Sequence, residues 1–162
     1  MISLLRADDR LVHGLVAVSW TNQLHPDILL VANDHAANDA MTKMTMKLAK
    51  PAGVILGIKD LSSAAKILNN PKYANKKIFV VTINVKDALT LKQSVEGINK
   101  VNVGTAGIHY KDGVSVLPQI KMTKDEFNCA SQLNNLGVEV FAQVNPTAES
   151  LNFAGIAKAF NQ

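Results

Sequence analysis

The 162-residue sequence predicts an α/β fold, namely a doubly wound, mostly parallel sheet with helices on both faces. Short apolar segments rich in β-branched residues alternate with amphipathic segments of helical length along the whole chain. The segment 27–32 (DILLVA) is apolar at nearly every position, as in a strand that helices cover on both faces. Alternating strands and helices of this kind form right-handed crossovers between parallel strands, so the arrangement is Rossmann-like.

Six segments are predicted to be strands, and a seventh is predicted to be an extended element at the edge of the sheet. The edge position follows from Pro118, because proline cannot donate a ladder hydrogen bond inside a sheet. An antiparallel edge strand is therefore compatible with the pattern. The predicted strands are residues 2–6, 27–32, 54–58, 77–82, 100–103 and 138–144, and the edge element is residues 114–120.

The helical segments carry recognisable starts and ends. Asp60 is a favourable N-cap for the helix that follows it, and Thr123 with Glu126 forms the sequence signature of a capping box. Gly137 is placed as a C′ residue after the helix that this box opens, and Pro51 ends an earlier helix. The predicted helices are residues 11–20, 38–49, 61–68, 86–95 and 123–136, with a last helix that runs from Pro146 toward Phe160.

The composition is that of a globular chain with 48% hydrophobic and 19% charged residues. The net charge is +4, but the basic residues are scattered and aromatic residues make up only 5%, so a nucleic-acid-binding surface is not expected. The positive charge instead favours acidic or phosphorylated partners. No apolar run reaches the roughly 20 residues of a membrane span, and charged residues interrupt the N-terminus at once, so a cytoplasmic protein is expected.

The single cysteine, Cys129, excludes an intramolecular disulfide and fits a reducing compartment. Its spacing with Leu133 and Leu136 predicts a position on the buried face of a helix. No basic neighbour is placed to lower its pKa, so a catalytic thiol is not expected.

Ligands of a parallel α/β sheet bind at the carboxyl ends of its strands. Here that edge is predicted to be formed by residues 7–13, 33–38, 82–85 and 104–113. Neither a Walker A sequence nor a G-x-G-x-x-G fingerprint is present, which argues against nucleotide binding. Gly104 and Gly107 lie in one of these loops, but two glycines are more typical of a turn than of a phosphate cradle.

The first loop combines residue types that handle a phosphoryl group. A neutral imidazole such as that of His13 is a nucleophile near pH 7, and it forms a labile P–N bond. Arg6 and Arg10 can pair with phosphate oxygens through their planar N–H groups. The free amides at the start of a helix attract the same oxygens.

Three further residues of this segment support that interpretation. Gly14 allows close approach of the backbone, and Asp8 or Asp9 could orient the arginines or fix the tautomer of the histidine. The alternative is structural: acidic and basic residues before a helix also form caps with local ion pairs, beside a histidine without a role. The residues alone favour the functional interpretation only modestly.

A metal site made of His13, His35, His109 and Asp34 is a further alternative, because both other histidines are predicted on loops at the same edge. Their spacing matches no recognised ligand signature, so we expect no metal. His25, beside a proline ahead of a strand, is expected to be an exposed turn residue.

Residues 8–16 (DDRLVHGLV), followed by Trp20, resemble the IIB component of the mannose/fructose/sorbose family, which includes N-acetylgalactosamine systems, of the bacterial sugar phosphotransferase system. In that family the pattern D-[DS]-R-[LI]-[IV]-H-G-Q-V surrounds the phosphorylated histidine. The resemblance continues at residues 31–34 (VAND), 46–54 (MKLAKPAGV), 102–104 (NVG) and 137–140 (GVEV), with Gln143, Val144 and Pro146. Leu15 stands where glutamine is usual, Thr105 replaces a second glycine, and His109 and Lys111 replace a commoner arginine-containing turn.

The resemblance implies a single IIB domain over residues 1–162 and a protein-N(pi)-phosphohistidine–sugar phosphotransferase. His13 would accept a phosphoryl group from a phosphorylated IIA protein or domain and pass it to a sugar held by the membrane IIC/IID permease. Arg10 and, less securely, Arg6 would hold the phosphate, supported by Asp8 or Asp9. No cofactor, metal or nucleic acid is implied.

Two glycines, Gly14 and Gly104, are candidates for contact with the phosphate. The resemblance also implies a cytoplasmic protein that associates peripherally with the permease. It leaves open which sugar is used, which imidazole nitrogen is phosphorylated and whether the protein forms a homodimer.

Overall fold

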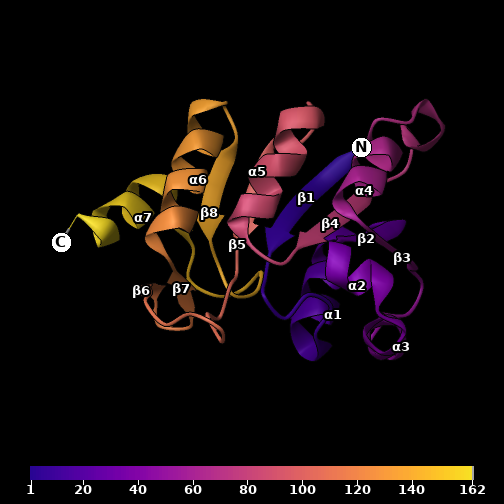
Figure 1. Ribbon diagram of the computed structural model, residues 1–162, viewed down its shortest axis with the longest axis horizontal. Helices are drawn as coiled ribbons and strands as arrows, with labels where there is room; N and C mark the ends of the chain where they lie inside the picture. The colour runs from indigo at the N-terminus through magenta and orange to yellow at the C-terminus, as the bar shows by residue number, and fades with distance from the viewer. Residues whose placement is uncertain (162) are drawn as a thin grey trace.

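The computed structural model describes residues 1–161, apart from the side chains of Leu15 and Val16, and confirms the α/β class (Figure 1). The main sheet has seven strands in the order β3-β2-β4-β1-β5-β8-β9. All neighbouring pairs are parallel except β8 and β9, which are antiparallel. The strands are β1 (Ile2–Ala7), β2 (Ile28–Ala32), β3 (Ile55–Lys59), β4 (Ile78–Thr82), β5 (Lys100–Val103), β8 (Glu139–Ala142) and β9 (Leu151–Asn152).

Helices cover the sheet on two sides, and each side has its own core (Figure 1). One core is built on Leu4, Trp20, Leu29 and Phe79, and the other on Leu5, Leu30, Val80 and further residues. Alternate residues of one strand thus enter opposite cores, because successive side chains of a strand point to opposite faces. The first core is closed by α1 (Gly14–Leu24), α2 (Asp34–Asn38) and α3 (Ala40–Leu48), and the second by α4 (Leu61–Leu68), α5 (Val85–Ser94), α6 (Lys124–Asn135) and α7 (Phe153–Phe160).

The helix boundaries predicted from capping residues are confirmed. The side chain of Asp60 accepts a hydrogen bond from the N–H of Ser63 at 2.7 Å. Thr123 and Glu126 form the reciprocal capping box of α6, and Gly137 follows that helix with a φ of +85°. These caps satisfy N–H groups that have no partner within the helix, which is why they mark its start reliably.

Several expectations about secondary structure and burial were wrong. The helix predicted at 38–49 is α3, which begins only at Ala40 because Asp39 caps it through Thr42. Residues 34–38, predicted to be part of a loop, form the separate helix α2. The helix predicted from residue 11 starts at Gly14, since Leu11 has a positive φ of 55° and interrupts the helical backbone. Leu136 is 55% exposed rather than buried, because it lies beyond the last turn of α6. Cys129, by contrast, is partly buried and packs against the core.

The predicted edge element at 114–120 is a separate antiparallel hairpin of β6 (Val114–Leu117) and β7 (Ile120–Met122), and Pro118 lies in its turn. The antiparallel edge strand of the main sheet is instead β9, which the sequence did not locate. A short 3₁₀ helix, η1 (Pro71–Tyr73), precedes β4. No helix among residues 1–161 has both the length and the apolar character needed to cross a membrane.

The topology creates a junction at the carboxyl ends of β1 and β5. From β1 the chain passes through α1 to β2, on one side of the sheet, whereas from β5 it passes through β6, β7 and α6 to β8, on the other. Loops that leave neighbouring strands in opposite directions open a crevice between them. The loops at residues 8–13 and 104–113 therefore meet at this point.

Candidate functional site

The carboxylate of Asp8 joins two arginines just beyond the end of β1. It is 1% exposed and accepts hydrogen bonds on both oxygens. Arg6 donates to Oδ2 from Nη2 at 3.0 Å and from Nε at 3.3 Å. Arg10 donates to Oδ1 from Nε at 2.9 Å and to Oδ2 from Nη2 at 3.0 Å, which is a bidentate pairing. Oδ1 also accepts a hydrogen bond from the backbone N–H of Arg10, at 3.0 Å.

Arg6 is hydrogen-bonded to Asp8 and connects three strands. Its guanidinium donates to Asn102 Oδ1 on β5 and, at 3.0 Å, to the carbonyl oxygen of Gln143 just after β8. It also lies 5.4 Å from the centre of the Trp20 ring. Burial lowers the pKa of Arg6, and the charge of Asp8 opposes this shift. With 2% exposure and partners on all three nitrogens, Arg6 is a buried anchor of the site.

Gly104 closes the space beside Arg6. Its N–H donates to the carbonyl of Ala7 at 2.8 Å, so this group already has a partner. A Cβ atom added at this position would overlap the guanidinium of Arg6. The glycine is therefore required here because the backbone approaches a buried side chain too closely for any other residue.

Arg10 is the arginine that reaches the surface. Its side chain is 23% exposed, and besides Asp8 it contacts the carbonyl oxygen of Gly104 at 3.2 Å through Nη2. The hydrogen bonds to Asp8 raise the pKa of Arg10, so Arg10 keeps its positive charge. No residue of the described part of the chain accepts a hydrogen bond from Nη1, which leaves that amino group available to a ligand.

Asp9 connects the loop after β1 to the loop after β5. Its carboxylate accepts hydrogen bonds from the N–H groups of Ala106 at 2.8 Å and Ile108 at 3.0 Å. Gly107, between them, has a φ of +73°, which turns both N–H groups toward the same anion. Asp9 therefore contacts backbone amides, whereas Asp8 orients the arginines.

His13 is exposed and stands immediately before α1. Its carbonyl accepts the first hydrogen bond of the helix, from Ala17 at 3.1 Å, while its side chain caps none of the helical N–H groups. Gly14 follows with a φ of +33° and no atom near its Cβ position, so its conformation, not close packing, requires glycine. The arrangement presents an imidazole beside uncapped helical amides and three residues from a fixed arginine.

Comparisons with known proteins show the family of this chain. Residues 2–161 match the family described as the sorbose subfamily IIB component of the PTS, the sugar phosphotransferase system. The chain belongs to this family. It is 40% identical to a probable phosphotransferase enzyme IIB component of Streptococcus pyogenes serotype M6 over 152 residues, which cover 91% of this chain and 93% of the relative. It is 30% identical to a sorbose-specific EIIB component of Lacticaseibacillus casei, with 93% and 91% covered.

Among solved structures, the IIBSor domain of the sorbose permease from Klebsiella pneumoniae has the same fold, with a TM-score of 0.90 at 24% identity. The match covers 98% of this chain and 97% of that one. The protein is thus a IIB component, a phosphotransferase of the sugar phosphotransferase system, with a Rossmann-like fold.

No hydrogen bond or ion pair among the described residues joins the other histidines of this IIB component to Asp8. His35 is not on a loop but in α2, where Nε2 lies 3.7 Å from Asp39. His109 is exposed in the loop after β5, and His25 is exposed with a φ of 49° at the end of α1, as expected for a turn residue. No group of three or more His, Cys, Asp or Glu residues within residues 1–161 could hold a metal, so the metal-site alternative has no support.

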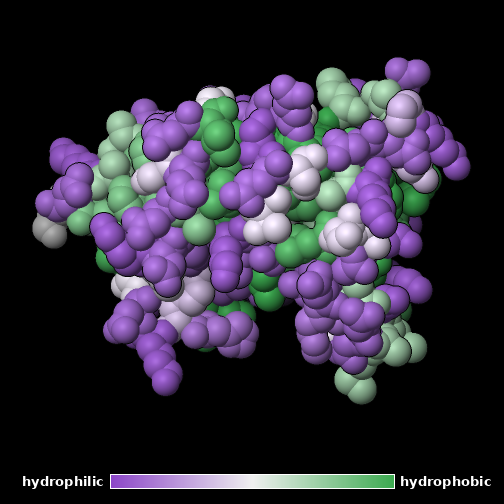
Figure 2. All heavy atoms as spheres, turned by 45° about the horizontal axis from the view of Figure 1, so that its top comes forward, coloured by the Kyte–Doolittle hydropathy of each residue, from purple (hydrophilic) through white to green (hydrophobic). Residues whose placement is uncertain are grey.

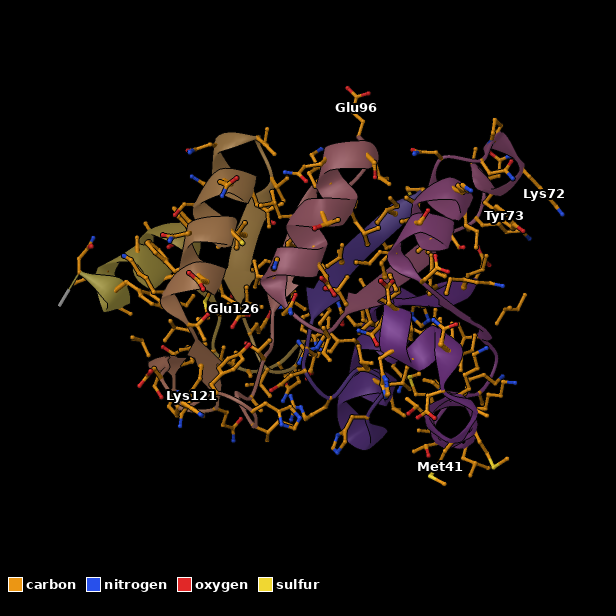
Figure 3. The ribbon with its side chains drawn as sticks, in the orientation of Figure 1. Met41, Lys72, Tyr73, Glu96, Lys121 and Glu126 are labelled. Atoms are coloured by element: carbon orange, nitrogen blue, oxygen red, sulfur yellow. The ribbon has the colours of Figure 1, made fainter. Side chains whose placement is uncertain are left out.

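A second polar group lies beneath the loop after β5. Thr105 is fully buried, and its hydroxyl donates to the carbonyl of Lys121 on β7 at 2.8 Å. Glu126 is buried at the start of α6 (Figure 3) and accepts from the N–H groups of Val85, at the start of α5, and Thr123. The Tyr110 hydroxyl is buried near Glu126 but makes no hydrogen bond of ordinary geometry with any described residue.

The protonation of this group is set by its surroundings. Burial raises the pKa of Glu126 above its ordinary value, and the contacts from Tyr110, Thr123 and Val85 only partly oppose the shift. Burial likewise raises the pKa of Tyr110, with the carboxylate of Glu126 adding to the effect. The loop that Asp9 holds on one side thus lies next to two buried groups whose pKa values are both raised above the ordinary ones.

Sequence reasoning did not assign the supporting residues Asn102, Gln143 and Trp20. Asn102 is an amide in an otherwise apolar strand, and it also donates to the Gln143 carbonyl at 3.2 Å. Trp20 donates from Nε1 to the carbonyl of Val144 at 3.1 Å. A buried amide within an apolar strand was the available signal, since such a group is kept only where it has a partner.

Replacement of Gly104 by alanine tests the close packing around Arg6. We expect a loss of about 1–3 kcal/mol in the free energy of unfolding, because the new methyl group must displace a buried guanidinium. Denaturant unfolding measures this. Gly113→Ala is the matched control, since its Cβ would lie at least 3.6 Å from other atoms; equal losses in both variants would contradict the expectation.

Replacement of Glu126 by glutamine tests the raised pKa. In the wild type the folded state binds this proton more tightly than the unfolded state, so stability falls as pH rises from the ordinary glutamate pKa through the raised one. Glu126→Gln removes the titrating group and should lose this part of the pH dependence. The measurement is the free energy of unfolding across this pH range. The control is Glu149→Gln, at an exposed position, which should keep the wild-type pH dependence. A wild-type pH dependence in Glu126→Gln would contradict the raised pKa of Glu126.

Proposed function

We propose that His13 accepts a phosphoryl group from a phosphorylated IIA protein or domain and donates it to a sugar during uptake. The observation that supports this most is the exposed His13, which follows by three residues an arginine, Arg10, whose guanidinium is oriented by the buried carboxylate of Asp8. Both residues belong to the segment that resembles the family's phosphorylation motif. The chain then works as one IIB domain over residues 1–162.

Each transfer exchanges one bond to phosphorus for another. A nitrogen lone pair of His13 attacks the phosphorus of the donor's phosphohistidine, a P–N bond to His13 forms, and the P–N bond to the donor breaks. The donor imidazole leaves with the electron pair of that bond and takes up a proton. In the second transfer a sugar hydroxyl attacks the same phosphorus, loses its proton and forms a P–O bond, and His13 leaves as imidazole.

Arg10 stabilises the phosphoryl group through its Nη1 amino group. Nε and Nη2 are occupied by Asp8 and Gly104, which fixes the plane of the guanidinium. Because the group is already oriented, little conformational entropy is lost when it pairs with phosphate oxygens. The uncapped N–H groups at the start of α1 add a second positive region, and Gly14 belongs to it.

Arg6, Asp8 and Asp9 act through other residues. The sequence suggested that Arg6 holds the phosphate, but its burial and complete set of protein partners favour a positioning role instead. Arg6 holds the carboxylate of Asp8 in place, and that carboxylate orients Arg10. Asp9 holds the loop after β5 against the site, and Gly104 supplies the space that Arg6 needs.

The partners follow from this role. A phosphorylated IIA protein or domain supplies the phosphoryl group, and a membrane IIC/IID permease presents the sugar, which is mannose, fructose, sorbose or an N-acetylated amino sugar. The protein works in the cytoplasm and associates peripherally with the permease. An exposed nucleophile on a fixed loop suits two partners that dock in succession.

Replacement of His13 by alanine tests the assignment of the nucleophile. The wild type, incubated with phosphoenolpyruvate, the general phosphotransferase proteins and a matching IIA, should gain one acid-labile phosphoryl group by intact mass, and His13→Ala should gain none. His35→Ala and His109→Ala are matched controls and should be labelled as the wild type is. Normal labelling of His13→Ala would show that the assignment is wrong.

Replacement of Arg10 by glutamine tests the role of its guanidinium. We expect the rate of phosphoryl transfer to fall by about 100-fold, since a fixed cationic donor to the transferring group is lost. Quench-flow labelling measures the rate, and denaturant unfolding checks that the variant is folded. Lys111→Gln, in the exposed loop after β5, is the control for loss of charge alone. A wild-type rate in Arg10→Gln would exclude this role.

A further inference from the structure

The outer face of α3 is apolar, although it faces solvent. Met41, Met44 and Leu48 are 78%, 64% and 84% exposed, and their spacing places them in one stripe along the helix. Met46, on the opposite side, is buried in the core. A surface helix normally has the reverse pattern, with polar residues outside. In Figure 2 apolar side chains gather in pale green at the lower right, where α3 lies, and in Figure 3 Met41 points away from the molecule.

The same segment carries most of the net charge of the protein. Residues 40–50 contain Lys43, Lys47 and Lys50 and no acidic residue. The chain has 17 basic and 13 acidic residues in total, so the remainder has 14 basic and 13 acidic residues, a net charge of +1. Lys43 and Lys47, four residues apart, line one flank of the apolar stripe. The nearest preceding acid, Asp39, is occupied as the N-cap through Thr42.

The three exposed side chains of the stripe line none of the principal clefts of residues 1–161. The principal clefts among the described residues are lined by other elements; one of about 380 Å³ lies beside Trp20 and Phe141, and another lies beside Asp60 and Thr90. A protein partner usually inserts its anchor residues into a pocket. Protruding flexible apolar side chains with lysines at their flank instead match the surface of a bilayer, which accepts apolar side chains and attracts cations with its anionic headgroups.

We propose that α3 is a contact surface for an anionic lipid bilayer. Met41, Met44 and Leu48 enter the boundary between headgroups and acyl chains, and the three lysines pair with lipid phosphates. This contact is made by the IIB chain itself and does not depend on the phosphoryl relay proposed above.

The position of α3 gives this contact a consequence for the site. α3 and α1 cover the same face of the sheet, and both lie toward the bottom of Figure 1. His13 immediately precedes α1. A chain that rests on the membrane through α3 keeps its nucleophile near the bilayer that holds the sugar permease.

Co-sedimentation with vesicles tests the proposal on the complete chain. We expect binding to vesicles of equal parts phosphatidylglycerol and phosphatidylcholine, weakened by salt, and little binding to phosphatidylcholine alone. A Met41→Ser, Met44→Ser, Leu48→Ser triple variant should lose at least about ten-fold in the partition coefficient. A Lys43→Gln, Lys47→Gln, Lys50→Gln triple variant should lose roughly five-fold per lysine.

The controls match these changes on other surfaces. Leu136→Ser removes an exposed leucine after α6, and Lys72→Gln with Lys76→Gln removes two exposed lysines near η1. Both control variants should bind vesicles as the wild type does, and thermal unfolding should show that every variant is folded. Equal losses in variants and controls would overturn the proposal.

Two other outcomes would overturn it as well. If the wild type does not bind anionic vesicles and the apolar triple variant dissociates a dimer in light scattering, the stripe is covered by a second copy of the chain. If vesicle binding is unchanged in that variant but phosphoryl transfer from IIA in solution is slowed, the stripe binds the donor protein. A failed relay assay with intact vesicle binding would leave the lipid contact standing.

Discussion

The site depends on one buried carboxylate, that of Asp8, which is shared by two arginines. Removing three charges from water is costly, and the cost is recovered only when each charge has hydrogen-bond partners of good geometry. Here Asp8 accepts on both oxygens, and Arg6 also reaches β5 and the residue after β8. The cluster therefore fixes the carboxyl ends of three strands relative to one another. Loss of Arg6 would remove two of the five hydrogen bonds that Asp8 accepts, and loss of Asn102 would remove one of the two acceptors of Arg6 Nη1.

This construction separates the reactive group from the groups that hold it in place. His13 is exposed and bears no capping role, while everything that orients Arg10 is buried or hydrogen-bonded. The proposed relay would benefit from this division, because two different partners would have to reach the imidazole of His13 in turn, and neither should have to reorder the site on arrival. Burial of the anchor also explains why one arginine of the motif faces the solvent while the other does not.

Much of the fold could be predicted from local signals. Asp60 and the pair Thr123 and Glu126 marked helix starts correctly, because capping depends on residues within one turn. The position of the loop after β1 followed from the alternation of strands and helices. The helix break at Asp39, the hairpin around Pro118 and the short strand β9 were missed, since each depends on a single residue or on pairing with a distant segment.

The same distinction applies to the site. The residue types of the motif indicated a phosphate chemistry, and the family resemblance indicated His13 and gave Arg10 more weight than Arg6, but neither showed that Arg6 is a buried anchor. That difference arises from Asn102, Gly104 and Gln143, which are about 100 to 140 positions away along the chain. Periodicity and spacing within the motif carry no information on which of its side chains a distant strand will cover.

The contact between Arg6 and the Gln143 carbonyl determines when the site can form. These residues are separated by 137 positions, and Gln143 directly follows β8. During synthesis the loop with His13 is therefore made well before β8, and Arg6 has no complete set of partners until Gln143 has been added. A nascent chain that stops before Gln143 thus carries His13, the proposed nucleophile, without a fully anchored arginine, so competence for the proposed transfer requires β8.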